Sequence, residues 1–333
     1  MSSQAPVFIG RSYRSPLVVL NKLALCLLFS FCYVFIVPWA EIKGTDFTDV
    51  ANYLARMQNL SQGSVFDLEF GVGFLFSEWL WKLLLYSVTI IFSDLEMGLL
   101  VLSFLSLFLY LMFFTRHLSL LLVLFFTTNP MFIDLIMSQV RIALAFSVFL
   151  FCLDSKNGIT KAFLIVTAFF IHSAVLLFLS IIIIIRLLRL LKLSKRSLLI
   201  MSVFLGLFVS LFMEYGVVWF LSLVGDRRAE QGGFEGGSSI FYAAIWFFIA
   251  TWLAIRAKAE SEYETTIISF SIVMMAIFFF NSVLNVYGQR FVSVSLGIIL
   301  FSIKRVRVYE QAYLFSFASV YYYFQWIYWV GND

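Results

Sequence analysis

Charged side chains are scarce in this chain, and that scarcity excludes an ordinary soluble domain. Of its 333 residues only 13% are charged, whereas 62% are hydrophobic. A soluble domain has about a quarter charged residues and about half apolar ones. A soluble fold of this composition would therefore lack polar residues for its surface. The composition predicts an integral membrane protein.

Cysteine and histidine are also few, which argues against several kinds of site. The three cysteines, Cys26, Cys32 and Cys152, lie within apolar runs, which favours packing roles over a disulfide framework. Two histidines leave no zinc-ligand pattern, and there is no Walker A loop. Asp46 and Asp49, three residues apart, are a weak signal for a divalent cation. We therefore expect no metal and no cofactor.

Long apolar runs fill most of the chain and predict membrane-spanning helices. A helix needs about 20 apolar residues to span the hydrocarbon, and runs that do not alternate exclude transmembrane strands. The predicted fold is all-α, polytopic and a single transmembrane domain over residues 1–333, with an acidic periplasmic loop at 41–69 and a glycine-rich one at 222–239. About eleven hydrophobic segments are predicted, at 18–40, 70–92, 97–115, 118–129, 132–153, 162–185, 197–221, 240–256, 265–284, 290–303 and 311–330.

Lysine and arginine gather at the ends of these segments, which predicts the orientation and argues against nucleic-acid binding. They place the N-terminus and the turns near 186–196, 256–258 and 304–307 in the cytoplasm, and the C-terminus in the periplasm. Two segments fit this count badly. Segment 162–185 has basic residues on both sides, and segment 118–129 is short. Either both are broken or re-entrant, or all eleven cross with two lysines outside.

Ionisable residues inside apolar segments are the sharpest functional signal, because each costs several kcal/mol in the bilayer and usually faces a cavity. Arg141, His172 and Arg290 are such residues. Two arginines and a histidine near the outer leaflet suit an anionic group on a lipid, since arginine offers planar donors to phosphate oxygens. Glu78 and Lys82, four apart, are most simply an internal ion pair on one helix face.

Five short stretches, in this order, resemble the EpsG-like branch of the Wzy-type bacterial polysaccharide polymerases. They are GTDFTDVANYLARM at 44–57, LEFGVGFL at 68–75, SQVRIALA at 138–145, FFIHSAVL at 169–176 and YGQRFVSVSL at 287–296. Two departures are Ile142, where the family often has Gln, and Phe70-Gly71, where Glu-Pro-Gly is common. The departure at Ile142 is accompanied by Gln139 two residues before Arg141.

The resemblance implies a glycosyltransferase of the bacterial inner membrane that works at the periplasmic face. Such enzymes join oligosaccharide repeat units carried on undecaprenyl pyrophosphate, as in O-antigen, capsule or exopolysaccharide synthesis. Donor and acceptor are both lipid-linked, so no nucleotide sugar is needed, and a chain-length regulator is a candidate partner protein.

These arguments assign expected roles to particular residues of this chain. Arg141 and Arg290, with Gln139 beside them, are expected to bind the donor pyrophosphate, an electrostatic form of catalysis. Asp49 is the first choice of general base, ahead of Asp46 and Glu69, and His172 joins the clamp or orients the acceptor hydroxyl. The substrate-binding set is completed by Tyr53, Tyr287, Arg227 and Arg228.

Other functions remain open at this stage. A GT-C-like glycosyltransferase that uses a lipid phosphosugar would add single sugars and would be sensitive to chelators if it needs a metal. A flippase for lipid-linked oligosaccharides would predict a charged tunnel and inverted repeats, and the sequence shows few intramembrane charges and no repeat. A membrane scaffold would not require costly buried charges.

Overall fold

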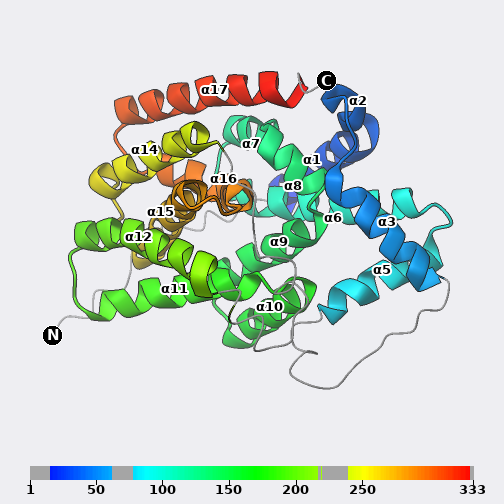
Figure 1. Cartoon of the computed structure of the whole chain (residues 1–333), viewed down its shortest axis with the longest axis horizontal. Coiled ribbons are helices and arrows are strands. Elements are labelled where there is room, and N and C mark those ends of the chain that lie inside the picture. The colour runs from blue at the N-terminus through cyan, green and yellow to red at the C-terminus, as the bar shows by residue number, and fades with distance from the viewer. Residues whose placement is uncertain (1–15, 62–77, 217–218, 220–238, 331–333) are drawn as a thin grey trace.

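The computed structural model describes residues 16–61, 78–216, 219 and 239–330. The elements among these residues are helices, as predicted (Figure 1). They are α1 (Pro16–Phe31), the π-helix η1 (Cys32–Ile36), α2 (Trp39–Lys43), α3 (Thr48–Ser61), α5 (Trp79–Ile91), α6 (Leu95–Phe114), α7 (Leu120–Thr127), α8 (Pro130–Met137), α9 (Val140–Asp154), α10 (Gly158–Ile171), α11 (Val175–Leu190), α12 (Lys195–Leu211), the π-helix η2 (Phe212–Gly216), α14 (Ile240–Arg256), α15 (Glu262–Val283), α16 (Gln289–Ile303) and α17 (Val308–Val330).

Several of these helices are long and apolar enough to cross a membrane. Within the described ranges they are Val18–Ile36, Leu95–Phe114, Lys195–Gly216 and Glu262–Val283, and a fifth span if α7 and α8, bent by 75° at their junction, count as one. Shorter apolar helices surround them. The structure thus supports a helical membrane protein but does not confirm a count of about eleven spans.

The core lies around α15, which is buried between α12, α14 and α16 (Figure 1). Close approach of α12 and α15 depends on a small residue. A Cβ added at Gly206 would lie 2.4 Å from the Cβ of Ala276, so a side chain there would push the two helices apart. Small residues at such contacts are typical of helices that pack within a bilayer.

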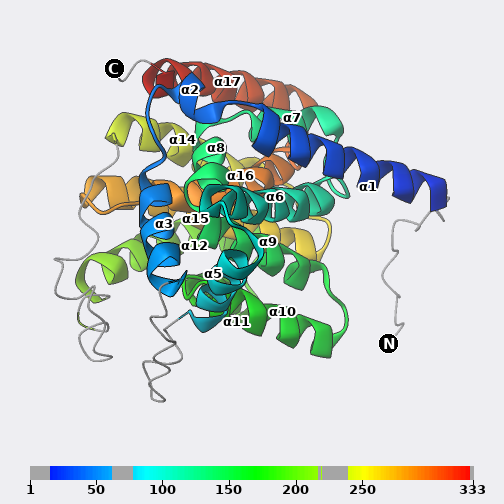
Figure 2. The same ribbon diagram turned by 90° about the vertical axis from the view of Figure 1, so that its right-hand side faces the viewer.

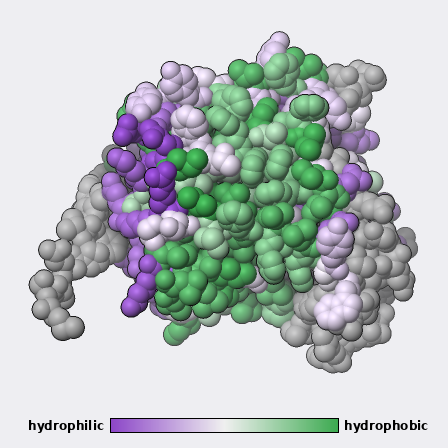
Figure 3. All heavy atoms as spheres, turned by 60° about the vertical axis from the view of Figure 1, so that its left-hand side comes forward, coloured by the Kyte–Doolittle hydropathy of each residue, from purple (hydrophilic) through white to green (hydrophobic). Residues whose placement is uncertain are grey.

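The basic turns predicted on one side of the membrane do gather at one end of the molecule, called the basic end below. Lys195 Nζ donates to the Ala259 carbonyl at 2.8 Å, and the Lys258 amide donates to the Arg305 carbonyl at 2.8 Å. Arg256 Nε donates to Glu310 at 2.7 Å. These contacts join the α11–α12, α14–α15 and α16–α17 turns. Figure 3 shows hydrophilic residues gathered along the left edge of the view, with a broad hydrophobic surface beside them.

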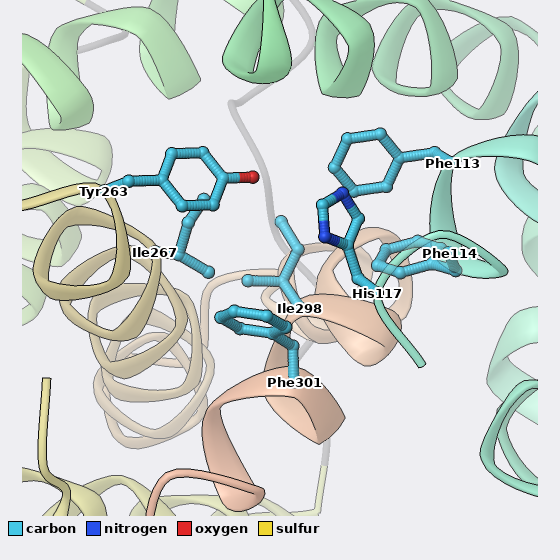
Figure 4. A pocket seen from close by; sticks show the side chains of 7 residues that line it. All are labelled: Phe113, Phe114, His117, Tyr263, Ile267, Ile298 and Phe301. Carbon is cyan, nitrogen blue, oxygen red and sulfur yellow. The ribbon is translucent and has the colours of Figure 1, made fainter. Parts of the chain in front are cut away.

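The N-terminal half of the chain reaches the same end. Lys22 Nζ of α1 donates to the Thr115 carbonyl at the end of α6, at 3.0 Å. Asp154 at the end of α9 lies 3.1 Å from His117 Nε2 and accepts from the Tyr263 hydroxyl at 2.9 Å. Figure 4 shows the His117 and Tyr263 side chains facing one another across a small apolar pocket. The far ends of α1, α6 and α9 therefore define a second end, called the site end below (Figure 2).

Segment 162–185, predicted as one doubtful span, is a helical hairpin broken at His172. α10 starts three residues after α9 and packs along it, and α11 ends beside Glu262, the first residue of α15, which pairs with Arg189. Lys161 and Arg186 both lie within electrostatic range of Cys152. The hairpin thus has its two open ends at the basic end, which explains the basic residues on both sides. Its arms are about 21 and 24 Å long, short of the hydrocarbon thickness.

Cysteine labelling tests this hairpin. We expect Ile159→Cys and Leu191→Cys, both at strongly exposed positions, to react from the same side of the membrane, in a chain whose native cysteines are replaced. Thr48→Cys, at the start of α3 on the site end, is the matched control and should react from the opposite side. Labelling of positions 159 and 191 from opposite sides would mean that the segment crosses after all.

A second predicted span, 70–92, is not confirmed by the part of it that the structure describes. Its described part is α5, which starts beside Glu78 at the site end and leads through three residues to the start of α6. Because α6 runs from there to Thr115 at the basic end, both ends of α5 lie at the site end. The acidic loop predicted at 41–69 contains α3 and part of α2, and the loop at 222–239 lies outside the described residues except for Ser239.

Candidate active site at the junction of two helix breaks

Glu78 is the centre of a buried polar cluster that also contains Arg141, His172 and Ser173. Its carboxylate accepts hydrogen bonds from Arg141 Nη1 and from His172 Nδ1. The Ser173 amide and hydroxyl donate to the same carboxylate at 3.1 and 3.2 Å. A carboxylate with four donors is compensated in charge and fixed in position, which is the condition for keeping an ion in a water-poor site.

Two helix breaks bring this cluster together. Arg141 lies in the first turn of α9, directly after the Ser138-Gln139 break, and His172 lies in the break between α10 and α11. Glu78 precedes α5 with a φ of 51°, in the left-handed region. Broken helices within a membrane are tolerated where the freed backbone faces protein or a polar cavity. The breaks therefore supply a backbone donor and polar side chains that meet at the Glu78 carboxylate.

Asp49 and Arg290 form a second, more open contact. Arg290 Nη2, in the first turn of α16, donates to Asp49 Oδ2 at 3.3 Å, and the Arg290 guanidinium lies 5.1 Å from the Tyr287 ring centroid. The Arg290 side chain is 42% exposed, and the Asp49 side chain is 26% exposed. The α3 backbone is anchored, because the Asp49 amide donates to Ser138 Oγ at 3.3 Å.

Tyr53 lies within electrostatic range of both the Glu78 cluster and the Asp49–Arg290 pair. It is buried on α3, packs edge-on against Trp81 with ring centroids 5.4 Å apart, and interacts electrostatically with Arg141, Asp49 and Arg290. Burial raises the pKa of the Tyr53 phenol, so its hydroxyl stays protonated and can donate a hydrogen bond. Tyr53 is thus close enough to interact electrostatically with both arginines that sequence reasoning singled out.

Several polar atoms at this place have no protein partner. Gln139 Oε1, Arg141 Nε and Arg290 Nε are buried without a hydrogen bond within the described ranges. Buried polar atoms are normally paired, so each unpaired one calls for an explanation. The two guanidinium N–H donors are suited to an anionic group, and the Gln139 amide oxygen, an acceptor, is suited to a hydroxyl of the same ligand.

The predicted site residues fall into three groups. Arg141, His172 and Gln139 lie at the helix breaks, and Asp49, Tyr53, Tyr287 and Arg290 lie beside them. Asp46 is exposed in the turn before α3. Glu69, Arg227 and Arg228 lie outside the described residues. Where the structure describes the chain, no three His, Cys, Asp or Glu side chains come together as metal ligands.

The Glu78–Lys82 ion pair expected from their spacing is wrong. Glu78 is bonded to Arg141 and His172, and no ion pair with Lys82 forms in the described part of the chain. The i to i+4 rule holds only when both residues are helical, whereas Glu78 lies just before α5 in a left-handed conformation. Sequence reasoning also missed Ser138 and Ser173. The signal that could have found Glu78 is a lone acid in a chain with arginine and histidine in neighbouring apolar segments.

Comparison with known proteins identifies the family of the chain. No curated protein and no solved structure matches the chain. The sequence model of the EpsG family matches residues 23–333, nearly the whole chain and all the described site residues. The chain therefore belongs to the EpsG family, a family of Wzy-like polysaccharide polymerases in the membrane.

Proposed function

We propose that this protein joins oligosaccharide repeat units carried on undecaprenyl pyrophosphate, at the periplasmic face of the bacterial inner membrane. The observation that supports this most strongly is the pair of arginines at the first turns of α9 and α16, both within electrostatic range of Tyr53. Helix N-termini attract anions, and arginine adds charge and donors in fixed geometry. A pyrophosphate is the anion that such a paired arrangement fits.

The orientation supports the periplasmic assignment. Cytoplasmic turns carry an excess of lysine and arginine, and the basic end holds the turns that gather such residues. The site lies at the other end. With the basic end in the cytoplasm, the site faces the periplasm, where flipped lipid-linked units are found.

The proposed step is a displacement at the anomeric carbon of the donor. The acceptor hydroxyl oxygen attacks this carbon and forms the new glycosidic bond, and the bond from the carbon to the pyrophosphate oxygen breaks. The electron pair leaves with the lipid pyrophosphate, and the hydroxyl proton passes to a protein base. Positive groups near the departing oxygen stabilise the negative charge that develops there.

The two arginines have different roles in this scheme. Arg141 is tied to the buried Glu78 carboxylate, so it is a fixed donor beside His172. Arg290 has one 3.3 Å ion pair with Asp49 and a cation–π contact with Tyr287, at a partly exposed position. Exposed ion pairs of this kind contribute about 0–1 kcal/mol, so a phosphate with more charge can replace the carboxylate. Arg290 is therefore the group that takes the donor pyrophosphate directly.

Asp49 is the proposed base, because release from Arg290 would leave its carboxylate beside the site on an anchored helix. His172 is the second candidate, since Glu78 fixes its Nδ1 and thereby the plane of its ring. In both cases the donor binds before the proton moves.

Asp49→Asn separates binding from chemistry. We expect the variant to bind the donor several-fold more tightly, because Arg290 no longer has a competing carboxylate, and to extend chains about a hundredfold more slowly because the base is lost. The measurement is kcat and KM for chain extension by the purified enzyme. Asp46→Asn, three residues away and exposed, is the control and should behave as the unaltered enzyme. Equal kcat for both variants would assign the base elsewhere.

The function itself is tested with purified lipid-linked repeat units in vitro. Polymerisation gives a ladder of products that differ by one repeat unit, whereas addition of single sugars gives steps of one sugar. Movement of units across vesicles without any ladder would support the flippase and overturn the proposal.

A further inference from the structure

A surface cavity of about 330 Å³ opens at the basic end, where α14 ends and α17 begins. Trp252, Ile255, Arg256, Tyr309 and Glu310 line it. It lies at the opposite end of the molecule from the candidate active site, and the proposed reaction makes no use of it. Its walls combine aromatic, aliphatic and guanidinium groups, which is the composition expected of a site for a ligand with both a charged and an apolar part.

The lining pairs Arg256 with Glu310, and Arg307 beside the cavity adds a positive charge to its rim. Glu310 is 1% exposed and accepts from Arg256 Nε at 2.7 Å and from the Arg307 amide at 3.0 Å, so its carboxylate is compensated. Arg307 Nη1 donates to the Tyr309 hydroxyl at 3.1 Å. Two guanidinium groups thus meet one carboxylate. The Arg256 side chain is 42% exposed, and its Nε is only one of five N–H donors.

An exposed apolar strip leads away from the cavity along α14 and α17. Phe248, Ile255 and Phe317 are each more than a third exposed. The Phe248 ring lies 5.7 Å from the Trp252 ring and 5.1 Å from the Phe317 ring, so the aromatic groups form a continuous surface between the two helices. The charged rim and the apolar strip therefore follow one another from the membrane interface toward its interior.

We propose that this cavity is a binding site for an anionic phospholipid of the inner leaflet. Its phosphate would be held by Arg256, Arg307 and the Tyr309 hydroxyl, and one acyl chain would lie along the strip. Basic cavities between helices on the cytoplasmic side suit anionic headgroups, and arginine bonds phosphate oxygens with two parallel donors. A free phosphate would leave the apolar strip unused, and a zwitterionic lipid would leave the positive rim less well matched.

The test is thermal unfolding of the purified, delipidated chain in detergent with added phosphatidylglycerol, phosphatidylcholine or inorganic phosphate. A ligand that binds only the folded state raises the Tm. We expect phosphatidylglycerol to raise it by several degrees, and the other two additives to raise it by about one degree or less. An equal shift with phosphatidylcholine, or an equal shift with inorganic phosphate, would overturn the assignment to an anionic lipid.

Variants connect that shift to the cavity. Arg256→Gln combined with Glu310→Gln leaves the net charge unchanged and removes both charges of the ion pair together, and Arg307→Gln alters an exposed residue. We expect the double variant to lose most of the phosphatidylglycerol shift and Arg307→Gln to lose part of it. Arg186→Gln, an exposed arginine at the same end on α11, should keep it. A full shift in the two cavity variants, or its loss in Arg186→Gln, contradicts the proposal.

Discussion

Arg290→Ala is expected to lower the rate of chain extension about a thousandfold, the effect of removing one preorganised donor from a developing oxyanion. Arg290 lies in the first turn of α16, and a cation–π contact with Tyr287 and one weak ion pair with Asp49 hold it. The alanine variant keeps the backbone N–H groups at the N-terminus of α16 but loses the guanidinium charge. Arg290→Lys should recover only part of the rate, because an ammonium cannot form two parallel bonds to phosphate.

The measurement is chain extension by purified enzyme, together with binding of a short-chain prenyl pyrophosphate as donor analogue. Fold loss is not expected, since Arg290 is partly exposed and its pair with Asp49 is weak. Arg186→Ala is the control, because it removes an exposed arginine at the basic end. Wild-type turnover in Arg290→Ala would remove the pyrophosphate clamp from the proposed mechanism.

Glu78→Ala is expected to cost about 3 kcal/mol of stability, because removal of one partner from a buried ion pair leaves the other charge uncompensated. Arg141, His172 and Ser173 all depend on this carboxylate. The same change frees the break between α10 and α11, so chain extension should also fall strongly. The free energy of unfolding is measured by titration with a denaturing detergent, and activity is measured at a temperature where the variant is folded.

Glu78→Gln separates the two effects. The amide keeps the shape and can still accept from His172 Nδ1, but the negative charge opposite Arg141 is lost. We expect Glu78→Gln to be less destabilised than Glu78→Ala while still impaired in chain extension. Glu41→Ala, an exposed glutamate in α2, is the control and should change stability by less than about 0.5 kcal/mol. Unchanged stability in Glu78→Ala would mean that the cluster does not hold the helix breaks together.

The pairing of Glu78 illustrates where inference from local spacing fails. Lys82 is four residues away, and the rule for helices predicts a pair. The structure instead places Glu78 before the helix, in a left-handed conformation. Its side chain therefore does not follow the face of α5, and its partners are 63 and 94 residues away in the chain. The tertiary structure selects these partners, because it brings Glu78 to the break before α9 and to the break between α10 and α11.

The count of about eleven spans is not confirmed, for a related reason. Hydropathy detects apolar segments but not their direction, so it left open whether 162–185 crosses or is broken, and the structure shows a turn at His172. The basic residues on both sides of this segment were the one local sign of a hairpin. Whether α5 crosses was decided by the contact between Lys22 and Thr115, which fixes the direction of α6.

The sequence by itself determined that the chain is a helical membrane protein, because too few polar residues remain to cover a soluble surface. It also singled out Arg141, His172 and Arg290, since a charge in an apolar segment is costly enough to be noticed without any structure. The tertiary structure decided which groups these residues meet: the Glu78 carboxylate for two of them, and Asp49, 241 residues away, for the third. Such pairings arise from helix breaks and helix packing, which leave no period in the sequence.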